Sequence, residues 1–313
     1  GVYNDDNMPG FGMDLKIENG RVQYPDLPRS IENIQVAMNI HSPEGNNMDN
    51  LTLDIPTFHM EIGKSAQNPN TIDARLSLRN PETDPLIDTK VTADLNLGSF
   101  KDVIPLDNNF NLAGMFHADF EMKGALSAIE NQQFNNFKAA GSAALTGFAY
   151  ADEDVNAQIP EARVSLTPQN LHLQTLKVIY EEMNIAMDGH LNNYIAYALT
   201  DTTLQGVFNL SIDKIDANKF ISDDETEEET EETTSPSEPI LVPDNLDVRL
   251  NAKIGEMKYD DLVISNISGA LGVKDQTVSL SDMVFQLLQG SGKMAGSYNT
   301  QNHNVPKADF SFN

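Results

Sequence analysis

Histidine and paired carboxylates are the residues of this chain that could do chemistry, either as metal ligands or as acids and bases. The sequence has 47 Asp and Glu residues, six His and no Cys. No two His residues are spaced four apart, as a helical zinc site requires, and the motif HExxH does not occur. Without Cys there are no disulfides and no thiolate chemistry. We therefore expect the His side chains to be structural, with no metal site.

Short acidic runs and a Gly-rich segment are the other candidates for catalysis. The acidic runs, at 152–154, 181–182 and 260–261, each lie between strand-like patterns, where a solvated turn is the ordinary interpretation. The Gly-rich segment 290–297 reads GSGKMAGS, and it lacks the Gly-Lys-Ser/Thr order of a phosphate-binding loop. The nucleophile motif G-x-S-x-G is also absent. We expect a protein that is not an enzyme and that uses no cofactor.

The chain is strongly acidic, with a formal net charge of −27. Nine of the acidic residues lie in the run 222–238, which contains no basic residue and which we expect to be a disordered, solvated loop. A calcium site is the alternative there, but the run lacks the ligand spacing and the Gly of a calcium loop. No cluster of Lys and Arg is present, which argues against nucleic acid and against attraction to anionic head groups.

The elements that must carry any site are strands, because the dominant periodicity is two. Residues 206–213 and 245–254 alternate between apolar and polar side chains, as a strand with one apolar face does. Short helical patterns occur at 97–104, 127–137 and 216–221, and Glu18-Asn19-Gly20 resembles a turn. The fold class we predict is all-β: an elongated, strongly curved antiparallel sheet, a half-open barrel or groove, built from repeated β-hairpin modules with a few short helices.

A weak internal repeat supports this architecture. Three segments, 24–78, 155–193 and 259–299, each contain a strand with an Ile, a strand of the L-x-L or V-x-L type, and a further apolar residue five positions on. Such repeats bury their faces by stacking side by side. We divide the chain into first β modules at 1–147 and second β modules at 148–313, the latter including the acidic loop 222–238.

An apolar stripe runs through the third copy of the repeat and the strand pattern 245–254 that precedes it. If the sheet carries acyl chains, this stripe would face them; filling of a core is the alternative, and alternation alone does not separate the two. The stripe consists of Leu246, Val248, Leu250, Leu271, Val273, Val278, Leu280, Phe285 and Leu287.

Residues 242–300 resemble the C-terminal region of the AsmA family as found in Bacteroidetes. The resemblance lies in a Pro followed by an alternating Leu/Val strand, a strand led by Tyr259, the hairpin Asn266-Ile-Ser-Gly269, an L-x-L-type strand and a closing Gly-rich strand. Segments 204–220 and 88–106 resemble the family's strand followed by a short helix, and 19–28 resembles another of its strands. These motifs are structural and include no catalytic residue.

The resemblance implies an envelope protein anchored in the inner membrane, with a large periplasmic β-structure. Relatives of AsmA, including TamB, are similar to bridge-like lipid transfer proteins, whose bent sheet has an apolar concave face. We therefore expect a non-enzymatic periplasmic segment that offers an apolar β-groove for lipid transfer or outer-membrane biogenesis. The partners would be acyl chains or envelope proteins, and a closed scaffold that contacts other envelope proteins is the alternative. The chain lacks a run of about 18 apolar residues, so we expect the anchor to lie outside this segment of a longer protein.

Overall fold

The computed structural model describes residues 9–44, 47–63, 70–105, 110–152, 155–199, 202–220, 240–303 and 305–313. The acidic run 222–238 lies outside the described residues, so its expected disorder stays a prediction. The strands are β1 (Pro9–Val22), β2 (Ile31–Glu44), β3 (Thr52–Ile62), β4 (Thr71–Arg79), β5 (Leu86–Asn96), β6 (Asn111–Ala125), β7 (Lys138–Ala151), β8 (Asn156–Leu166), β9 (Asn170–Tyr180), β10 (Met183–Asn192), β11 (Leu204–Asp216), β12 (Leu246–Tyr259), β13 (Leu262–Lys274), β14 (Thr277–Leu287), β15 (Gly290–Asn299) and β16 (Lys307–Phe312).

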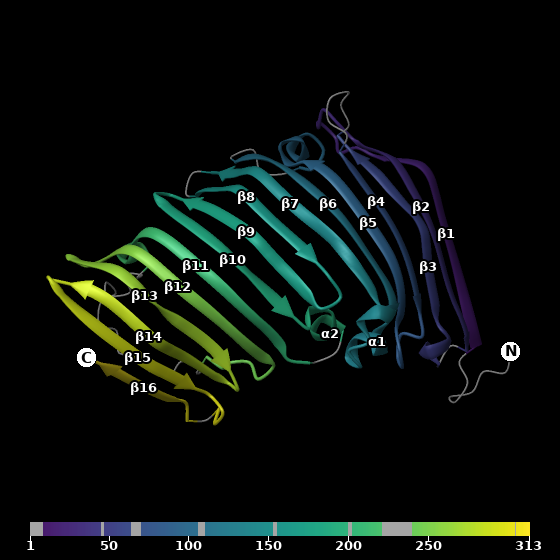
Figure 1. Cartoon of the computed structure of the whole chain (residues 1–313). Coiled ribbons are helices and arrows are strands. Elements are labelled where there is room, and N and C mark those ends of the chain that lie inside the picture. The colour runs from purple at the N-terminus through teal and green to yellow at the C-terminus, as the bar shows by residue number, and fades with distance from the viewer. Residues whose placement is uncertain are drawn as a thin grey trace, which may run out of the picture. The chain divides into compact units, whose positions relative to one another are not determined.

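Helical structure is short and lies between strands (Figure 1). The segments are the α-helices α1 (Leu126–Glu130) and α2 (Tyr194–Leu199), and the 3-10 turns η1 (Met48–Asn50), η2 (Leu97–Asp102), η3 (Phe134–Asn136) and η4 (Ala217–Phe220). The three helical patterns predicted from the sequence correspond to η2, to α1 with η3, and to η4. The helix α2 was not predicted.

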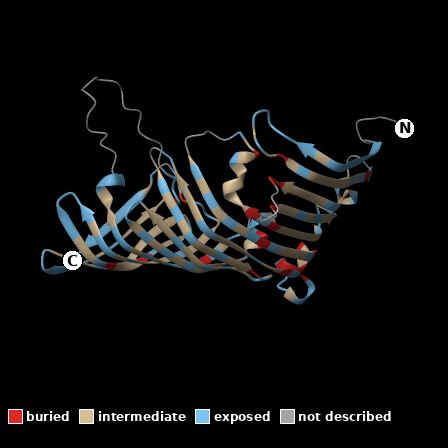
Figure 2. Ribbon diagram, turned by 90° about the horizontal axis from the view of Figure 1, so that it is seen from above, coloured by how far each residue is buried: buried red, intermediate tan, exposed pale blue. Residues whose placement is uncertain are grey.

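Strand order in the sheet follows the sequence, from β1 at one end to β16 at the other. Neighbouring strands pair as antiparallel hairpins, for example β12 with β13 and β13 with β14. The pair β11 and β12 is parallel. This confirms the predicted all-β fold of repeated hairpins in an open sheet, and within each compact unit the sheet is twisted and curved (Figures 1 and 2).

Contacts divide the chain into two compact units, residues 1–176 and 177–313. The boundary predicted after residue 147 falls within β7. The predicted modules 1–147 and 148–313 stay a prediction. The predicted repeat is visible in the strands: its three copies correspond to β2–β4, β8–β10 and β13–β15. Each copy is a run of three successive strands, and the strand that follows the first copy, β5, leads directly into η2.

The first unit has a small core where η2 folds over one face of its sheet. Val103, just after η2, is 1% exposed, and it packs with Ile62 of β3 and Leu95 of β5. Phe100 and Ile104 also pack against this cluster. Burial of these side chains is the main stabilising contribution at this end of the strands.

The buried Asn70 fixes η2 to the sheet. Its Nδ2 donates a hydrogen bond to Ser99 Oγ at 2.5 Å, and its Oδ1 accepts one from the backbone N–H of Asn96 at 2.5 Å. The side chain of Asn96 in turn accepts from the N–H of Gly98, which caps η2. The Ser99 hydroxyl also donates to the Asn96 carbonyl at 2.7 Å, so Asn70, Asn96 and Ser99 form one partly buried hydrogen-bond network.

Candidate functional site: the apolar face of the second unit

The predicted stripe lies on one face of the second unit, and strand register brings its members into rows. Val248 of β12 pairs with Val273 of β13, which pairs with Val278 of β14. Directly paired residues on adjacent strands point to the same side of a sheet. A second row, one alternation further along, joins Leu250, Leu271 and Leu280. The structure therefore brings six of the nine predicted residues together in two adjacent rows.

The remaining three members stand beside these rows. Leu246 pairs with Leu204 of β11. Phe285 pairs with Gly292 of β15, and Leu287 pairs with Gly290. A bulge between Leu280 and Met283 adds one residue to β14, so the alternation resumes with Met283, Phe285 and Leu287 on the apolar side. A contact with Gly269 agrees with this placement of Met283. Gly269 lies on the apolar side, and a Cβ built on it would lie 2.2 Å from the Met283 Sδ.

The same rows continue over strands that the sequence prediction left out. Towards β10 and towards β15–β16, the rows contain further apolar residues and glycines. The two-residue alternation of 206–213 was the sequence signal from which the stripe could have been extended to β11. The full rows are Leu191, Gly206, Val248, Val273, Val278, Tyr298 and Ala308; Gly189, Phe208, Leu250, Leu271, Leu280, Gly296 and Phe310; and Ile185, Ile212, Ile254 and Ile267.

This apolar face is only half covered. Val248, Leu250 and Leu280 are half-buried, and Leu271 is 38% exposed. In the first unit, where η2 covers the sheet, Leu95 is only 8% exposed. Within the part of the chain that the structure describes, no second sheet lies over these rows, and Figure 2 shows few buried residues along the strands. The side chains are shielded by their neighbours in the same layer.

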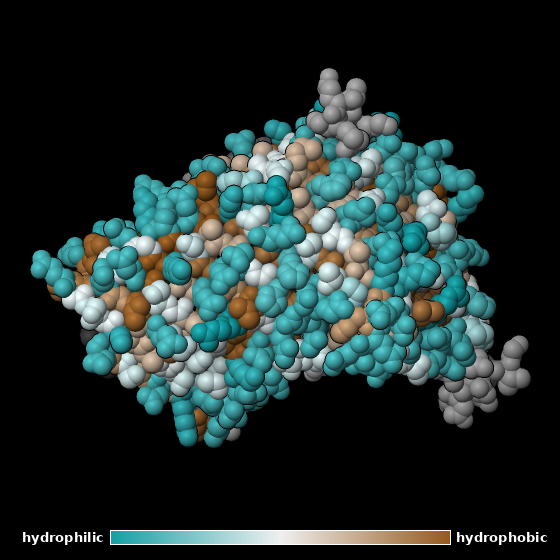
Figure 3. All heavy atoms as spheres, in the orientation of Figure 1, coloured by the Kyte–Doolittle hydropathy of each residue, from teal (hydrophilic) through white to brown (hydrophobic). Residues whose placement is uncertain are grey.

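The opposite face of the second unit is polar and hydrogen-bonded. Asn251 donates to Asn209, which donates to Asp188, across three neighbouring strands at 3.1 and 2.9 Å. Lys274 pairs with Asp247 at 2.7 Å. The view in Figure 3 looks onto a face where hydrophilic residues predominate. One side of the layer is thus polar and the other apolar.

A side-chain amide sets the charge state of one carboxylate at the end of β11. Asn184 donates to Asp213 from both its side chain and its backbone, at 2.6 and 2.8 Å. These hydrogen bonds, the side-chain one first, hold the pKa of the Asp213 carboxyl below its usual value. The carboxylate therefore stays ionised and ties β10 to β11.

The first unit has a corresponding apolar face, with ion pairs on its other side. Its longest row is Ile17, Val36, Phe58, Ala74, Val91, Phe120, Gly141 and Leu166. On the polar side, Asp88 accepts from Lys123 and Arg75, both at 2.7 Å. The hydrogen bond from Lys123 is the largest cause that keeps the pKa of Asp88 below its usual value.

The candidate catalytic residues do not converge. His59 Nδ1 lies 2.7 Å from Asp73, His117 Nδ1 lies 2.5 Å from Asp94, and His172 and His190 lie in β9 and β10. The runs 181–182 and 260–261 form turns, and 290–297 lies in strand β15. Among the described residues, no group of three or more His, Asp or Glu could hold a metal ion.

The chain matches no protein-family model, no curated protein and no solved structure. Over the described residues, none of the helices has the length and apolar character needed to cross a membrane.

Proposed function

We propose that this chain is a non-enzymatic segment of an AsmA-like envelope protein and that it offers an apolar β-surface to lipid acyl chains. The observation that supports the proposal is the set of apolar rows on β10–β16, in register and covered by no second layer among the described residues. A soluble protein seldom leaves so extended an apolar surface to water unless a ligand or partner covers it.

The physical gain from such binding is apolar burial. Each fully buried methylene contributes about 0.8 kcal/mol, so about ten half-covered methylenes would contribute roughly 4 kcal/mol. Side chains such as Leu250, Leu271 and Leu280 provide the contact area without any directional polar group. The surface therefore retains acyl chains with little selectivity for their length.

The resemblance to AsmA supplies the cellular setting of the proposal. In that setting the segment is periplasmic, the full-length protein is anchored in the inner membrane, and the apolar surface is part of a path for lipid transfer or outer-membrane biogenesis. The sequence features that support it are the strand-and-short-helix units, which correspond to β5 with η2 and to β11 with η4.

A scaffold that binds other envelope proteins is the second candidate, and the edge strand β1 favours it. Phe11, Met13 and Leu15 are 46%, 48% and 42% exposed. Among the described residues β1 pairs with β2 on one side only, so its other edge can accept a strand from a partner. A measurement of acyl-chain binding separates the lipid-binding surface from the scaffold, because a partner strand can add to β1 without any acyl chain being bound.

The test measures acyl binding in two matched variants. Leu271→Glu places a charge on the apolar face, and Ala295→Glu places the same charge on the polar face, where Ala295 pairs with Ser311. We expect Leu271→Glu to weaken binding of a fluorescent fatty acid at least about tenfold and to reduce the lipid that co-purifies from membranes, while Ala295→Glu does neither. Equal binding by both variants, or consistently lipid-free protein, would rule out the proposal.

A further inference from the structure

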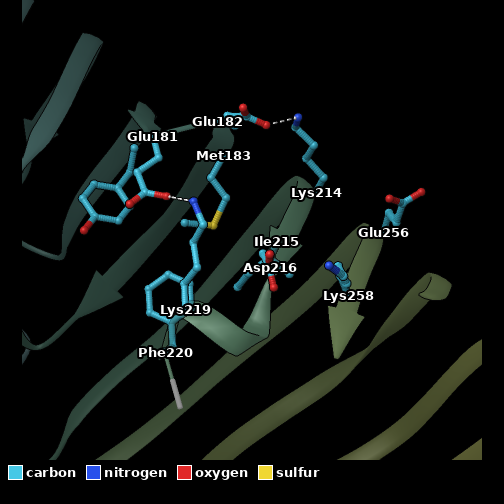
Figure 4. A pocket seen from close by; sticks show the side chains of 11 residues that line it. Glu181, Glu182, Met183, Lys214, Ile215, Asp216, Lys219, Phe220, Glu256 and Lys258 are labelled. Atoms are coloured by element: carbon cyan, nitrogen blue, oxygen red, sulfur yellow. Dashed lines mark hydrogen bonds and ion pairs between the residues drawn. The ribbon is translucent and has the colours of Figure 1, made fainter. Parts of the chain in front are cut away.

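A cavity of about 370 Å³ lies at one end of the strands of the second unit (Figure 4). Its walls come from the turn between β9 and β10, from the end of β11 with η4, and from the end of β12. The volume is at the lower end of the range of about 300–1,000 Å³ that is typical of small-ligand sites. A compact polar group fits such a space.

One side of this cavity is apolar. Met183, Ile215 and Phe220 line it. Met183 follows the same alternation in β10 as Ile185, and Ile185 begins one of the apolar rows. Glu256 and Lys258 flank Met257, which pairs with Ile264 and through it with Leu287 of the apolar side, so these two charged residues lie on the polar side. The cavity lies at the strand ends and is lined from both sides, so a ligand lying on the apolar face could place its polar end here.

Two of the three lysines in the cavity are already neutralised. Lys214 pairs with Glu182 at 2.9 Å, and Lys219 pairs with Glu181. The hydrogen bond that Lys214 donates to Glu182 lowers the pKa of Glu182, and the one that Lys219 donates to Glu181 raises the pKa of Lys219. Both pairs stay ionised, and they leave little net charge for a ligand.

The charges that remain are one cation and two carboxylates. Lys258 lies opposite Asp216 in the register of β12 with β11, and Glu256 precedes Lys258 by two residues. Within the described residues, Lys258 and Glu256 make no hydrogen bond or ion pair, although Glu256 lies opposite Lys214 in the register of β12 with β11. Positive and negative groups are thus presented side by side.

Asn218 of η4 holds this part of the cavity in place. Its backbone N–H donates to Asp216 Oδ1 at 3.2 Å. Its side chain accepts from the backbone N–H of Asp260 at 2.7 Å and donates to the carbonyl of Asp260 at 3.4 Å. These contacts connect the end of β11 to the turn after β12, and they position the carboxylate before a ligand arrives.

We propose that the cavity binds a zwitterionic phosphate–amine group of the phosphoethanolamine type. Lys258 binds the phosphate, and Glu256 with Asp216 binds the ammonium. A purely anionic head group would meet two carboxylates, and a purely cationic group would meet Lys258. The inference rests on the proposed function, since it places an acyl chain on the apolar face and the head group in the cavity.

The test compares two short-chain lipids that differ only in the head group. Dihexanoyl phosphatidylethanolamine and dihexanoyl phosphatidylglycerol are titrated into the chain below their micellar concentrations. We expect the ethanolamine lipid to bind about tenfold more tightly and Glu256→Gln to abolish this preference. Lys258→Gln should instead weaken the binding of both lipids, because both carry the phosphate. The matched control is Lys253→Gln, an exposed lysine of β12 outside this cavity, which should keep the preference.

Two further arms separate the possible failures. Fatty acid binding is measured in every variant: if it persists while the wild type shows no head-group preference, this inference is wrong and the proposed function stands. If fatty acid binding is absent from the wild type, the proposed function fails first. Soluble phosphoethanolamine is the last probe. If it binds as tightly as the lipid, and if Lys258→Gln weakens this binding, the result supports recognition of a phosphate–amine group and assigns the cavity to a free metabolite. Loss of the preference for the ethanolamine lipid in the control variant Lys253→Gln would contradict the assignment of head-group binding to this cavity.

Discussion

Gly189 of β10 lies directly opposite Phe208 of β11, and the Phe208 ring occupies the space that a side chain at 189 would need. A Cβ placed on Gly189 would approach Phe208 Cδ1 to 2.4 Å. The same relationship joins Gly292 with Phe285, and Gly296 with Phe310. Each glycine lets a ring lie flat on the neighbouring strand, which offsets the low strand propensity of glycine.

Gly189→Ala should therefore destabilise the second unit. The added methyl group displaces the Phe208 ring, and we expect a loss of about 1–2 kcal/mol in the free energy of unfolding, measured with urea. The double variant with Phe208→Leu should recover only the part of the loss that is due to the ring, because the added Cβ would also meet the Val207 carbonyl oxygen at 2.4 Å. Gly290→Ala is the control, because its nearest contact would be an ordinary 3.5 Å. Equal losses in both single variants would show that the ring is not the cause.

Leucine truncation should distinguish the covered and the open parts of the sheet. Leu95→Ala removes a buried side chain from the core beneath η2, and we expect it to lower stability by about 2–4 kcal/mol. Leu271→Ala removes a side chain that is 38% exposed, and we expect less than about 1.5 kcal/mol. Urea unfolding of the two variants measures both. A loss for Leu271→Ala as large as that for Leu95→Ala would mean that the apolar face is covered in solution.

Asn70→Ala should loosen η2 from the first unit. The substitution leaves the N–H of Asn96 and the hydroxyl of Ser99 without their buried partner, and we expect a loss of about 2–3 kcal/mol. Hydrogen exchange should also speed up in residues 97–104. Asn131→Ala is the matched control, since the Asn131 amide bonds to the Ser127 carbonyl at an exposed position. That variant should change stability by less than about 0.5 kcal/mol.

Alkaline pH should destabilise the second unit through Tyr194. Burial raises the pKa of Tyr194 to about 12, from an ordinary value of 10.0. The folded chain therefore holds this proton to higher pH than the unfolded chain, so the stabilising contribution is complete below about pH 10 and is lost as pH rises through about 12. Tyr194→Phe should lose less stability than the wild type over this interval, measured by urea unfolding at each pH. Identical profiles would contradict the assignment.

The strands and most of the helical turns could be predicted because their signals are local. Two-residue alternation marked 206–213 and 245–254 correctly, and the pattern at 97–104 marked η2. Glu18-Asn19-Gly20 was wrong as a turn: Asn19 has a φ of 53°, and the residues form a bulge that adds one residue to β1 against β2. A left-handed Asn before Gly suits a bulge as well as a turn, so sequence alone does not separate them.

Pairing between strands is not a local signal, and this limited the prediction of the site. The predicted stripe on β12–β14 could be drawn from alternation within each strand, but its continuation through Phe208 and Phe310 depends on register. The parallel pairing of β11 with β12 has no sequence signature in either strand. Likewise, the mixed-charge cavity brings Glu181 and Lys219 together from separate elements, so its members could not be recognised along the sequence.

The half-covered face has a consequence for how such a protein changes over generations. Residues in a two-layer core are constrained by partners on the opposing layer, so one enlarged side chain requires another to shrink. Leu250 and Leu280 have no opposing layer among the described residues, and the backbone ladder keeps β12–β14 in register whatever apolar side chain they carry. Sequence drift can therefore widen, narrow or reshape this surface without disturbing the fold, which under the proposed function leaves the choice of apolar ligand free to evolve.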